Sequence, residues 1–157
     1  MSTFLVTGSN RGIGLELCKQ IFARGDEVIA TCRKPSSELN NLDVRIETDI
    51  DISSEDSITN LRKKLSGVEL DCLIHNAGIY EFNSIDNLDR ESIIRQFVVN
   101  ALSPLYMTKS LKFLLKKSSK IVFVTSRMGS ISDNSSGSSY GYRMSKVALS
   151  MAAKSLS

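Results

Sequence analysis

The chain has only one histidine and three cysteines, and each scarcity excludes a class of site. An odd number of cysteines cannot be fully paired, and Cys18, Cys32 and Cys72 lie far apart without a C-x-x-C motif. We therefore expect neither a disulfide scaffold nor a cysteine-rich zinc site. Their apolar neighbours predict small buried side chains instead. The single histidine, His75, has no second histidine with which to share an ion, so we expect no metal site.

The sequence also lacks a long apolar run, a basic leader and an excess of either charge. It opens Met-Ser-Thr-Phe-Leu-Val-Thr, which predicts no signal peptide, no transmembrane helix and a cytoplasmic location. The 20 Lys and Arg against 17 Asp and Glu give a net charge of +3, with the two signs interspersed. This balance favours neither nucleic acid nor a membrane surface as a partner.

Short apolar runs alternate with longer segments of helical periodicity. Strands are predicted at 3–7, 27–31, 44–48, 70–74 and 120–125, and helices over about 13–22, 54–65, 89–117 with a bend near Pro104, and from Tyr140 onward. This alternation is typical of a parallel sheet covered by helices on both faces. Right-handed crossovers then predict an α/β, doubly wound Rossmann domain of about five strands over residues 1–157. The Ser-rich stretch 130–139 fits a linker or an active-site loop, and its place after a buried strand favours the loop.

Three glycines stand at the turn that follows the first strand, in the spacing G-x-x-x-G-x-G. Glycine lets the backbone turn sharply and approach a ligand closely, and the helix that follows offers free N–H groups to a pyrophosphate. The spacing differs from both the common dinucleotide fingerprint and the P-loop, and such a turn also occurs for its geometry alone. Its place after the first strand favours ligand binding. The candidate cofactor-binding residues here are Gly8, Ser9, Asn10, Arg11, Gly12, Ile13 and Gly14.

The second predicted strand ends in Thr31-Cys32-Arg33-Lys34, without an acid. An acid at this point would bond the ribose 2′-hydroxyl of NAD and repel a 2′-phosphate. An arginine can hold that phosphate through two hydrogen bonds. Arg33, together with Arg11, therefore favours NADP over NAD, and the alternative for each is a solvated surface arginine.

Tyr142 and Lys146 stand four residues apart, and so on one face of the last predicted helix. A lysine ammonium beside a tyrosine hydroxyl stabilises the phenolate, which suits the tyrosine to general acid or base work. The hydroxyl of Ser126, at the end of the fifth strand, could hydrogen-bond a substrate carbonyl. Tyr140 is a decoy, because the residue four positions on is Met144. A Tyr-x-x-x-Lys spacing also occurs by chance on exposed helices.

Together these residues resemble the short-chain dehydrogenase/reductase family over essentially the whole chain, and most of all its C-factor and sniffer-type carbonyl reductases. The resemblance rests on the glycine motif at 7–14, Asp49-Ile50, Asn76-Ala77-Gly78, Asn100, Ser126 and Tyr142-x-x-x-Lys146. It implies NADP as cofactor, hydride transfer to or from a small carbonyl or alcohol substrate, and a homo-oligomer, either a dimer or a tetramer.

The resemblance also implies a role for each matched position. In the cofactor site, the three glycines would bind the pyrophosphate, Asp49 with Ile50 the adenine, and Asn76, Ala77 and Gly78 would line the cleft. At the catalytic centre, Tyr142 would pass the proton, Lys146 would tune Tyr142 and hold the nicotinamide ribose, Ser126 would orient the substrate, and Asn100 would support a proton relay.

Two departures from the family pattern qualify this expectation. His75 replaces the first asparagine of the frequent Asn-Asn-Ala-Gly form. Family members also continue past the Tyr–Lys helix with further strands, so the chain is expected to be truncated at its C-terminus, with residues 121–124 on an exposed edge strand. Three hypotheses stay open: an NADP-dependent reductase, a truncated and catalytically weak dinucleotide-binding module, and a signalling protein that keeps the fold.

Overall fold

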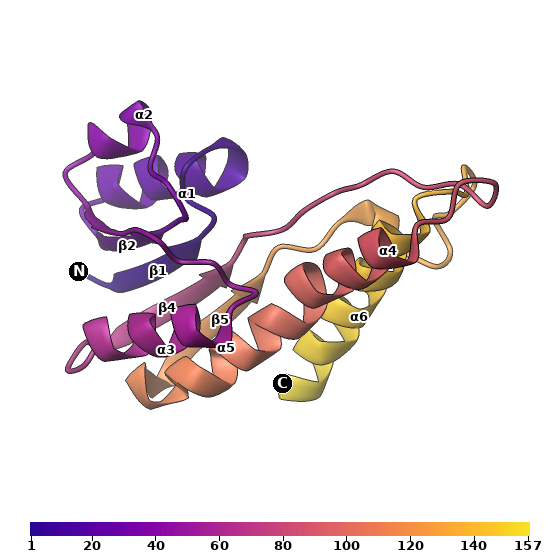
Figure 1. Cartoon of the computed structure of the whole chain (residues 1–157). Helices are drawn as coiled ribbons and strands as arrows, with labels where there is room; N and C mark the ends of the chain where they lie inside the picture. The colour runs from indigo at the N-terminus through magenta and orange to yellow at the C-terminus, as the bar shows by residue number, and fades with distance from the viewer. The chain divides into compact units, whose positions relative to one another are not determined.

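The computed structural model describes all 157 residues, which form two compact units. The first, here called the sheet unit, comprises residues 1–77 and 107–122. The second, the helical unit, comprises residues 78–106 and 123–157. Figure 1 shows the strands in the first and a pair of long helical segments in the second.

The sheet has five strands in the order β3-β2-β1-β4-β5. Its parallel pairs are β1 with β2, β1 with β4 and β2 with β3. This order confirms the predicted doubly wound α/β fold, because consecutive parallel neighbours require helical crossovers. The strands are β1 (Thr3–Thr7), β2 (Glu27–Thr31), β3 (Arg45–Glu47), β4 (Leu70–His75) and β5 (Leu115–Phe123).

The helices of the sheet unit are α1 (Gly12–Ala23), α2 (Ser37–Asn40), α3 (Glu55–Lys64) and the short 3-10 helix η2 (Lys112–Leu114). Of these, α2 and α3 begin at serines that cap them. The Ser54 hydroxyl accepts the Ser57 N–H at the start of α3, whose first turn is acidic and last turn basic, as the helix dipole favours. Buried aliphatic side chains form the core of this unit, among them Leu5, Ile29, Leu61, Leu73, Met107 and Leu111.

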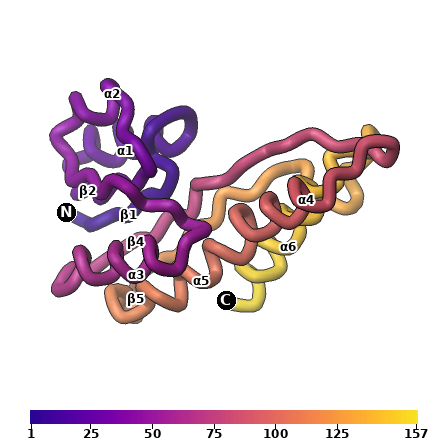
Figure 2. The backbone as a smooth tube through the Cα atoms, in the orientation of Figure 1, coloured from indigo at the N-terminus to yellow at the C-terminus, as the bar shows by residue number.

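The helical unit consists of helices and two long loops. Its elements are α4 (Arg90–Phe97), the π-helix η1 (Val98–Leu102), the start of α5 (Ser103–Leu111), the 3-10 helix η3 (Arg127–Gly129) and α6 (Tyr140–Leu156). Helices α4 and α6 lie side by side in Figures 1 and 2. A Cβ on Gly141 would stand 2.6 Å from the Gln96 amide nitrogen and 3.1 Å from the Ile93 Cα, so this close approach requires glycine.

The region between residues 89 and 125 departs from its predicted boundaries. The helical run ends at Leu114 rather than Lys117, and β5 spans 115–123 rather than 120–125. The extended start of β5 is fixed by tertiary pairing, because the Ser119 hydroxyl donates to the Leu70 carbonyl at 2.6 Å. The irregularity expected near Pro104 lies at 98–102, as a π-helix, since proline has no N–H to donate to the carbonyl of Asn100.

Strand β5 lies at one edge of the sheet, as predicted. Val122 on this strand is 40% exposed. An edge strand presents unpaired N–H and carbonyl groups that can pair with another chain. Among the helices, none combines the length and the apolar character that crossing a membrane requires.

Candidate active site

The glycine turn of the sheet unit packs closely on itself. A Cβ on Gly8 would stand 2.9 Å from the Ala77 Cα, and one on Gly14 would stand 2.2 Å from the Gly8 carbonyl oxygen. These two glycines are therefore required by the turn itself. Gly12 is different, because its φ is +55° and a Cβ there would meet nothing within 4 Å. The backbone at Gly12 is thus open to an approaching group.

The start of helix α1 leaves its N–H groups without side-chain acceptors. The residue before the helix, Arg11, makes no capping hydrogen bond, and the first turn holds no acid. Free N–H groups and the positive end of the helix dipole attract anions. Ile13 in this first turn is 63% exposed, which is unusual for an isoleucine and leaves it accessible to a ligand. This end of α1 has the chemistry of a phosphate site.

Asn76 and Ala77 fasten the glycine turn to the end of β4. The Asn76 amide donates to the carbonyls of Thr7 and Gly8 at 2.9 and 3.2 Å. The backbone N–H groups of Asn76 and Ala77 both donate to the Thr7 hydroxyl at 3.0 Å. The structure therefore brings together the predicted residues at 7–14 and 76–77, which lie far apart in the sequence.

The end of β2 carries the residues predicted to choose between cofactors. Arg11 and Arg33 are exposed, and neither forms a salt bridge. The Asp49 N–H donates to the Arg33 carbonyl at 3.1 Å, with Asp49 in the left-handed region at a φ of +61°. The Asp49 side chain is exposed, whereas that of Ile50 belongs to the core. A side-chain contact from Ile50 to a ligand is thus disfavoured.

Helix α6 places Tyr142 and Lys146 together in the helical unit. The Lys146 ammonium lies 5.7 Å from the centre of the Tyr142 ring and donates to the Val124 carbonyl at 3.0 Å. Lys146 is 4% exposed and forms no salt bridge. Burial lowers the pKa of Lys146, because the low-dielectric surroundings disfavour its charged form. A poorly solvated ammonium gains from any neighbouring negative charge, which a tyrosine phenolate would supply.

Asn100, in the π-helix, joins the segment after β4 to the helix of Tyr142. Its amide accepts the Ile79 N–H and donates to the Ile79 carbonyl, both at 2.8 Å. It also donates to the Ser145 hydroxyl at 3.0 Å, and that hydroxyl donates to the Tyr142 carbonyl at 2.8 Å. A Cβ on Gly78 would come within 3.0 Å of the Asn100 oxygen, so Gly78 allows this close approach.

Ser126 stands at the N-terminus of η3. Its hydroxyl oxygen accepts the Met128 N–H at 3.2 Å, which leaves the hydroxyl proton available for another acceptor. A Cβ on Gly129 would lie 3.0 Å from the Lys146 Cβ, so η3 packs directly on α6. The helical unit therefore gathers the four predicted catalytic residues on α6, η1 and the turn that packs against α6.

Three residues of this unit were missed by the sequence reasoning. The Tyr80 ring lies edge-on to the Tyr142 ring, with centroids 5.1 Å apart and planes at 89°. The Gln96 amide accepts the Glu81 N–H at 3.0 Å and donates to the Glu81 carbonyl at 3.1 Å. Asn83 is 1% exposed, and its side-chain oxygen accepts the Gly141 N–H at 3.3 Å. The sequence held one signal for Gln96: it and Asn100 are carboxamides one helical turn apart, and so lie on one face of the helix.

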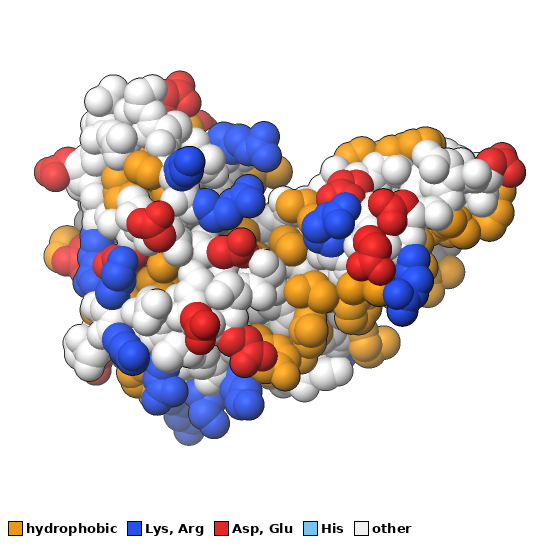
Figure 3. Space-filling model, in the orientation of Figure 1, with side chains coloured by type: hydrophobic (Ala, Val, Ile, Leu, Met, Phe, Trp, Pro, Cys, Tyr) orange, Lys and Arg blue, Asp and Glu red, His pale blue; other side chains and the backbone are white.

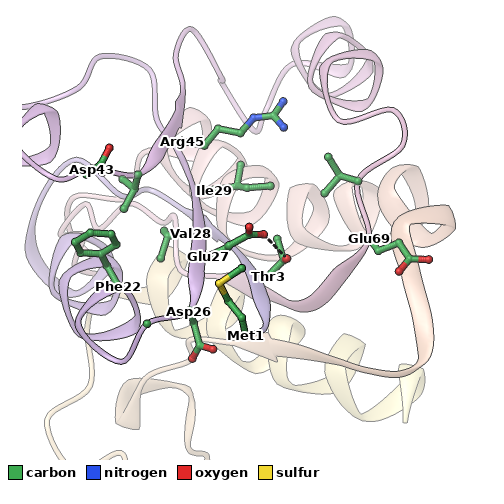
Figure 4. Close-up of a pocket in the computed structure, with 13 residues that line it drawn as sticks. Met1, Thr3, Phe22, Asp26, Glu27, Val28, Ile29, Asp43, Arg45 and Glu69 are labelled. Carbon is green, nitrogen blue, oxygen red and sulfur yellow. Dashed lines mark hydrogen bonds between the residues drawn. The ribbon is translucent and has the colours of Figure 1, made fainter.

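A separate hollow of about 580 Å³ opens at the other end of the sheet (Figure 4). Residues around the starts of β1, β2 and β3 line it, including Thr3, Glu27 and Arg45, with Phe22 from α1. The Thr3 hydroxyl donates to the Glu27 carboxylate at 2.9 Å within it. None of the predicted site residues lines this hollow, because the glycine turn follows the carboxyl end of β1.

Comparisons with known proteins show the family to which the chain is similar. The family model described as short chain dehydrogenase matches residues 2–157. A 1-hydroxy-2-glutathionyl-2-methyl-3-butene dehydrogenase of Rhodococcus sp. strain AD45 is 39% identical over 153 residues, 96% of this chain and 68% of that protein. The C-signal protein of Myxococcus xanthus is 41% identical over 91 residues, 56% of this chain and 55% of that protein. The chain thus spans between about half and two thirds of the length of such relatives.

Solved structures show the same similarity. A putative short-chain dehydrogenase/reductase from Burkholderia multivorans with bound NADP has a TM-score of 0.91 and 32% identity, covering 99% of this chain and 71% of that one. The carbonyl reductase Sniffer of D. melanogaster has a TM-score of 0.89 and 28% identity, covering 99% of this chain and 74% of that one. The predicted resemblance to C-factor and sniffer-type proteins is confirmed as a similarity. On its fold and on a family model that spans nearly its whole length, this chain belongs to the short-chain dehydrogenase family of oxidoreductases.

Proposed function

We propose that this chain is an NADP-dependent oxidoreductase that transfers a hydride between the nicotinamide and a small carbonyl or alcohol substrate. The observation that carries the proposal is the buried Lys146 ammonium, 5.7 Å from the Tyr142 ring and without any carboxylate partner. A buried cation without a counter-ion costs free energy, and that cost is lowered when a phenolate forms beside it. Structural lysines are seldom arranged in this way.

The residues of the sheet unit suit the phosphate end of a dinucleotide. The uncapped start of α1 and the open backbone at Gly12 would hold the pyrophosphate. Arg11 and Arg33, both exposed and outside any salt bridge, would hold a 2′-phosphate, and the exposed Asp49 would lie at the adenine. When bound, the cofactor supplies or accepts the hydride. The choice of NADP over NAD rests on the two arginines.

In the helical unit each proposed catalytic group has a distinct task. Tyr142 gives its hydroxyl proton to the substrate oxygen in reduction and takes it back in oxidation. Lys146 stabilises the phenolate that remains. Ser126, whose hydroxyl proton is left free by the Met128 contact, donates a hydrogen bond to the same substrate oxygen. Asn100 holds the main chain of Ile79 and the Ser145 hydroxyl, and so supports a proton path beside α6.

The proposal is tested by measuring NADPH oxidation by the whole chain with a panel of aldehydes and ketones, beside NADPH and NADH binding. We expect carbonyl-dependent NADPH oxidation and tighter binding of NADPH than of NADH. Equal affinity for the two cofactors would contradict the assignment of Arg11 and Arg33. NADPH oxidation that does not depend on an added carbonyl would contradict the substrate class.

A second candidate function is suggested by the similarity to the C-signal protein of Myxococcus xanthus, which is 41% identical to this chain over 91 residues. The chain spans 55% of the Myxococcus C-signal protein and 68% of the Rhodococcus dehydrogenase. A dinucleotide-binding or signalling module that keeps the fold but turns over weakly would bind NADPH without oxidising it. Binding with no turnover across the carbonyl panel would favour this alternative.

We also propose that the chain self-associates through the outer face of its helical segment. Ile94, Phe97, Leu102, Leu105 and Tyr106 are each at least 37% exposed along α4, η1 and α5. Figure 3 shows apolar side chains gathered over α4 and α5. An apolar stripe of this kind favours contact with a second copy. Sedimentation equilibrium should report a dimer or tetramer, and Phe97→Glu should shift it toward monomer.

A further inference from the structure

One arginine beside the proposed catalytic tyrosine binds several points of the loop that precedes α6. The Arg143 Nε donates to the carbonyls of Gly137 and Ser138 at 3.3 and 3.1 Å. Its Nη1 donates to the Met128 carbonyl at 3.4 Å, and its Nη2 to the Ser136 hydroxyl at 2.9 Å. No carboxylate pairs with this guanidinium. Its charge is therefore committed to loop carbonyls rather than to a counter-ion.

The loop end that Arg143 binds has an unfavourable backbone conformation. Gly137, Ser138 and Ser139 all lie in the left-handed region, with φ of +62°, +53° and +51°. Only glycine adopts this region without steric cost, so the two serines are strained. Such strain persists only where the surroundings hold the backbone in place. The Arg143 contacts to the carbonyls of 137 and 138 are well placed to do so.

Contacts from the segment after β4 complete the turn. The Ser139 N–H donates to the Asn83 carbonyl at 2.7 Å, and the Tyr80 hydroxyl lies 3.1 Å from the Ser139 hydroxyl. The Arg143 N–H donates back to the Ser139 carbonyl at 2.9 Å, which closes the first turn of α6. The Arg143 side chain hydrogen-bonds both Met128 and the 136–138 turn.

These two contact points bracket the proposed catalytic hydroxyls. Met128, held by Nη1, also donates its N–H to the Ser126 hydroxyl. The 137–139 turn leads directly into the first turn of α6, which carries Tyr142. We propose that Arg143 is a positioning residue that fastens the 128–138 loop to α6 and so fixes Ser126 relative to Tyr142. The catalytic consequence rests on the proposed function, whereas the fastening of the loop does not.

The geometry requires an arginine rather than any cation. The guanidinium offers five N–H donors in a rigid plane, and here it serves four acceptors in two separate stretches of chain. A lysine ammonium has three donors at a single point and cannot reach the same set. The substitution Arg143→Lys is therefore expected to behave more like Arg143→Ala than like the natural chain.

Amide hydrogen exchange of the full chain tests the fastening without any need for activity. Arg143→Ala and Arg143→Lys should make the amides of 128–139 exchange about 10- to 100-fold faster, which corresponds to losing hydrogen bonds from a charged donor. Adding Ser138→Gly to Arg143→Ala should restore part of the protection, because glycine relieves the left-handed strain. The matched control is Arg127→Ala, an exposed arginine of the same loop paired with Asp133, which should leave 136–139 unchanged.

Steady-state kinetics test the consequence for catalysis. Arg143→Ala should lower kcat about 10²-fold, the cost of misplacing reacting groups, with NADPH affinity unchanged and little recovery in Arg143→Lys. Exchange in the loop that matches the natural chain, or an equal effect from Arg127→Ala, would overturn the proposal. Faster exchange with an unchanged kcat would refute the link to Ser126 and Tyr142. A natural chain without turnover would contradict the proposed function, and the exchange result would still decide the fastening.

Discussion

Lys146 shows how a single residue can be made chemically unusual by its surroundings. It is nearly fully buried, donates to one backbone carbonyl and lies beside the Tyr142 ring. An ordinary surface lysine would keep its hydration and its mobility. Here burial lowers the pKa of Lys146, because its charged form is poorly solvated. In the proposed mechanism, the phenolate of Tyr142 would stabilise that charge.

The first prediction concerns this pair. Tyr142→Phe removes the hydroxyl proton and should lower carbonyl reduction by at least about 10²-fold, the usual contribution of a general acid. NADPH binding should remain. The control Tyr140→Phe removes an identical hydroxyl two residues away and should leave the rate unchanged. Both rates are measured as NADPH oxidation, and full activity of Tyr142→Phe would defeat the mechanism.

A second residue prediction concerns His75, whose imidazole lies 2.8 Å from the Thr108 hydroxyl. Burial lowers the pKa of His75 from 6.5 to about 3, since the charged imidazolium is poorly solvated there. The unfolded chain then binds a proton that the folded chain refuses, so stability falls as pH drops from about 6.5 towards 3. The slope is up to about 1.4 kcal/mol per pH unit.

The measurement is the free energy of unfolding by denaturant at several pH values, for the natural chain and for His75→Gln. Lowered carboxyl pKa values, such as that of Asp51, also reduce stability in acid. His75→Gln retains the carboxyl contribution to the pH dependence of stability and should lose only the contribution of His75. Parallel curves for the two proteins across this range would show that His75 does not contribute.

The third prediction concerns cofactor choice. Arg33→Asp replaces a cation with a carboxylate that repels a 2′-phosphate and can bond a ribose hydroxyl. It should weaken NADPH binding about 10-fold or more while sparing or improving NADH binding. Lys63→Asp makes the same charge change on α3 and serves as control. If titration shows that Arg33→Asp weakens NADPH and NADH binding equally, the effect of Arg33 is a general electrostatic one.

At the scale of elements, side-chain amides of α4 and η1 bind the main chain of the segment that follows β4. Gln96 and Asn100 pair with the main chain of residues 81 and 79, alternate positions of an extended segment. This resembles one edge of a strand ladder in which carboxamides replace the neighbouring backbone. The segment so fixed continues to Asn83, which reaches the start of α6. Helices α4 and α6 are therefore joined by polar bonds as well as by packing.

The fourth prediction tests that junction. Helix α6 has no side-chain cap from the residue before it, and Asn83 supplies an acceptor from a distant segment. Asn83→Ala should lower the free energy of unfolding by about 1 kcal/mol, as for loss of a helix cap. The loss is limited because the Asn83 amide nitrogen is buried without an acceptor and is removed as well. Asn134→Ala, the same change in an exposed loop, should cost almost nothing in the same denaturation experiment.

At the scale of the whole molecule, β5 is a second surface that can pair with another chain, because it forms one edge of the sheet. It ends the sheet order, alternates between exposed and half-buried side chains from Ser118 onward, and carries no proline. Edge strands of this kind template pairing with other chains unless a charge interrupts them. Its first six residues hold three lysines and its last three residues are apolar, so pairing is expected at residues 121–123.

The fifth prediction follows from this edge. Val122→Lys adds an edge charge at a 40% exposed position and should reduce concentration-dependent light scattering. The free energy of unfolding should change by less than roughly 1 kcal/mol, as at other exposed sites. Val122→Thr, with similar shape and no charge, should scatter as the natural chain does. Equal scattering from all three proteins would locate the association elsewhere.

Local sequence pattern was enough for the elements whose residues agree with their surroundings. The strands at 3–7 and 27–31 have the predicted boundaries, because β-branched residues there lie between clear turn signals. The predicted start of the fifth strand at residue 120 was wrong, since the strand begins at residue 115. Lys116 and Ser119 have no strand pattern in the sequence and are held extended by contacts with β4. Among candidate site residues, Tyr142 and Lys146 could be found from their short spacing. Tyr80, Asn83 and Arg143 could not, because their partners are Tyr142, Gly141 and Met128, at no regular spacing in the sequence.

The sequence by itself determined the fold class and the family and led to the proposed reactive groups, because these depend on periodicity and on short motifs along one strand or helix. The tertiary structure decided which of those groups are buried and which side chains hold them in place. It buried the Lys146 ammonium, bound the glycine turn to Asn76, and used Arg143 to hold two strained serines. Such outcomes depend on contacts between segments far apart in the chain, and desolvation and strain arise only once those contacts form.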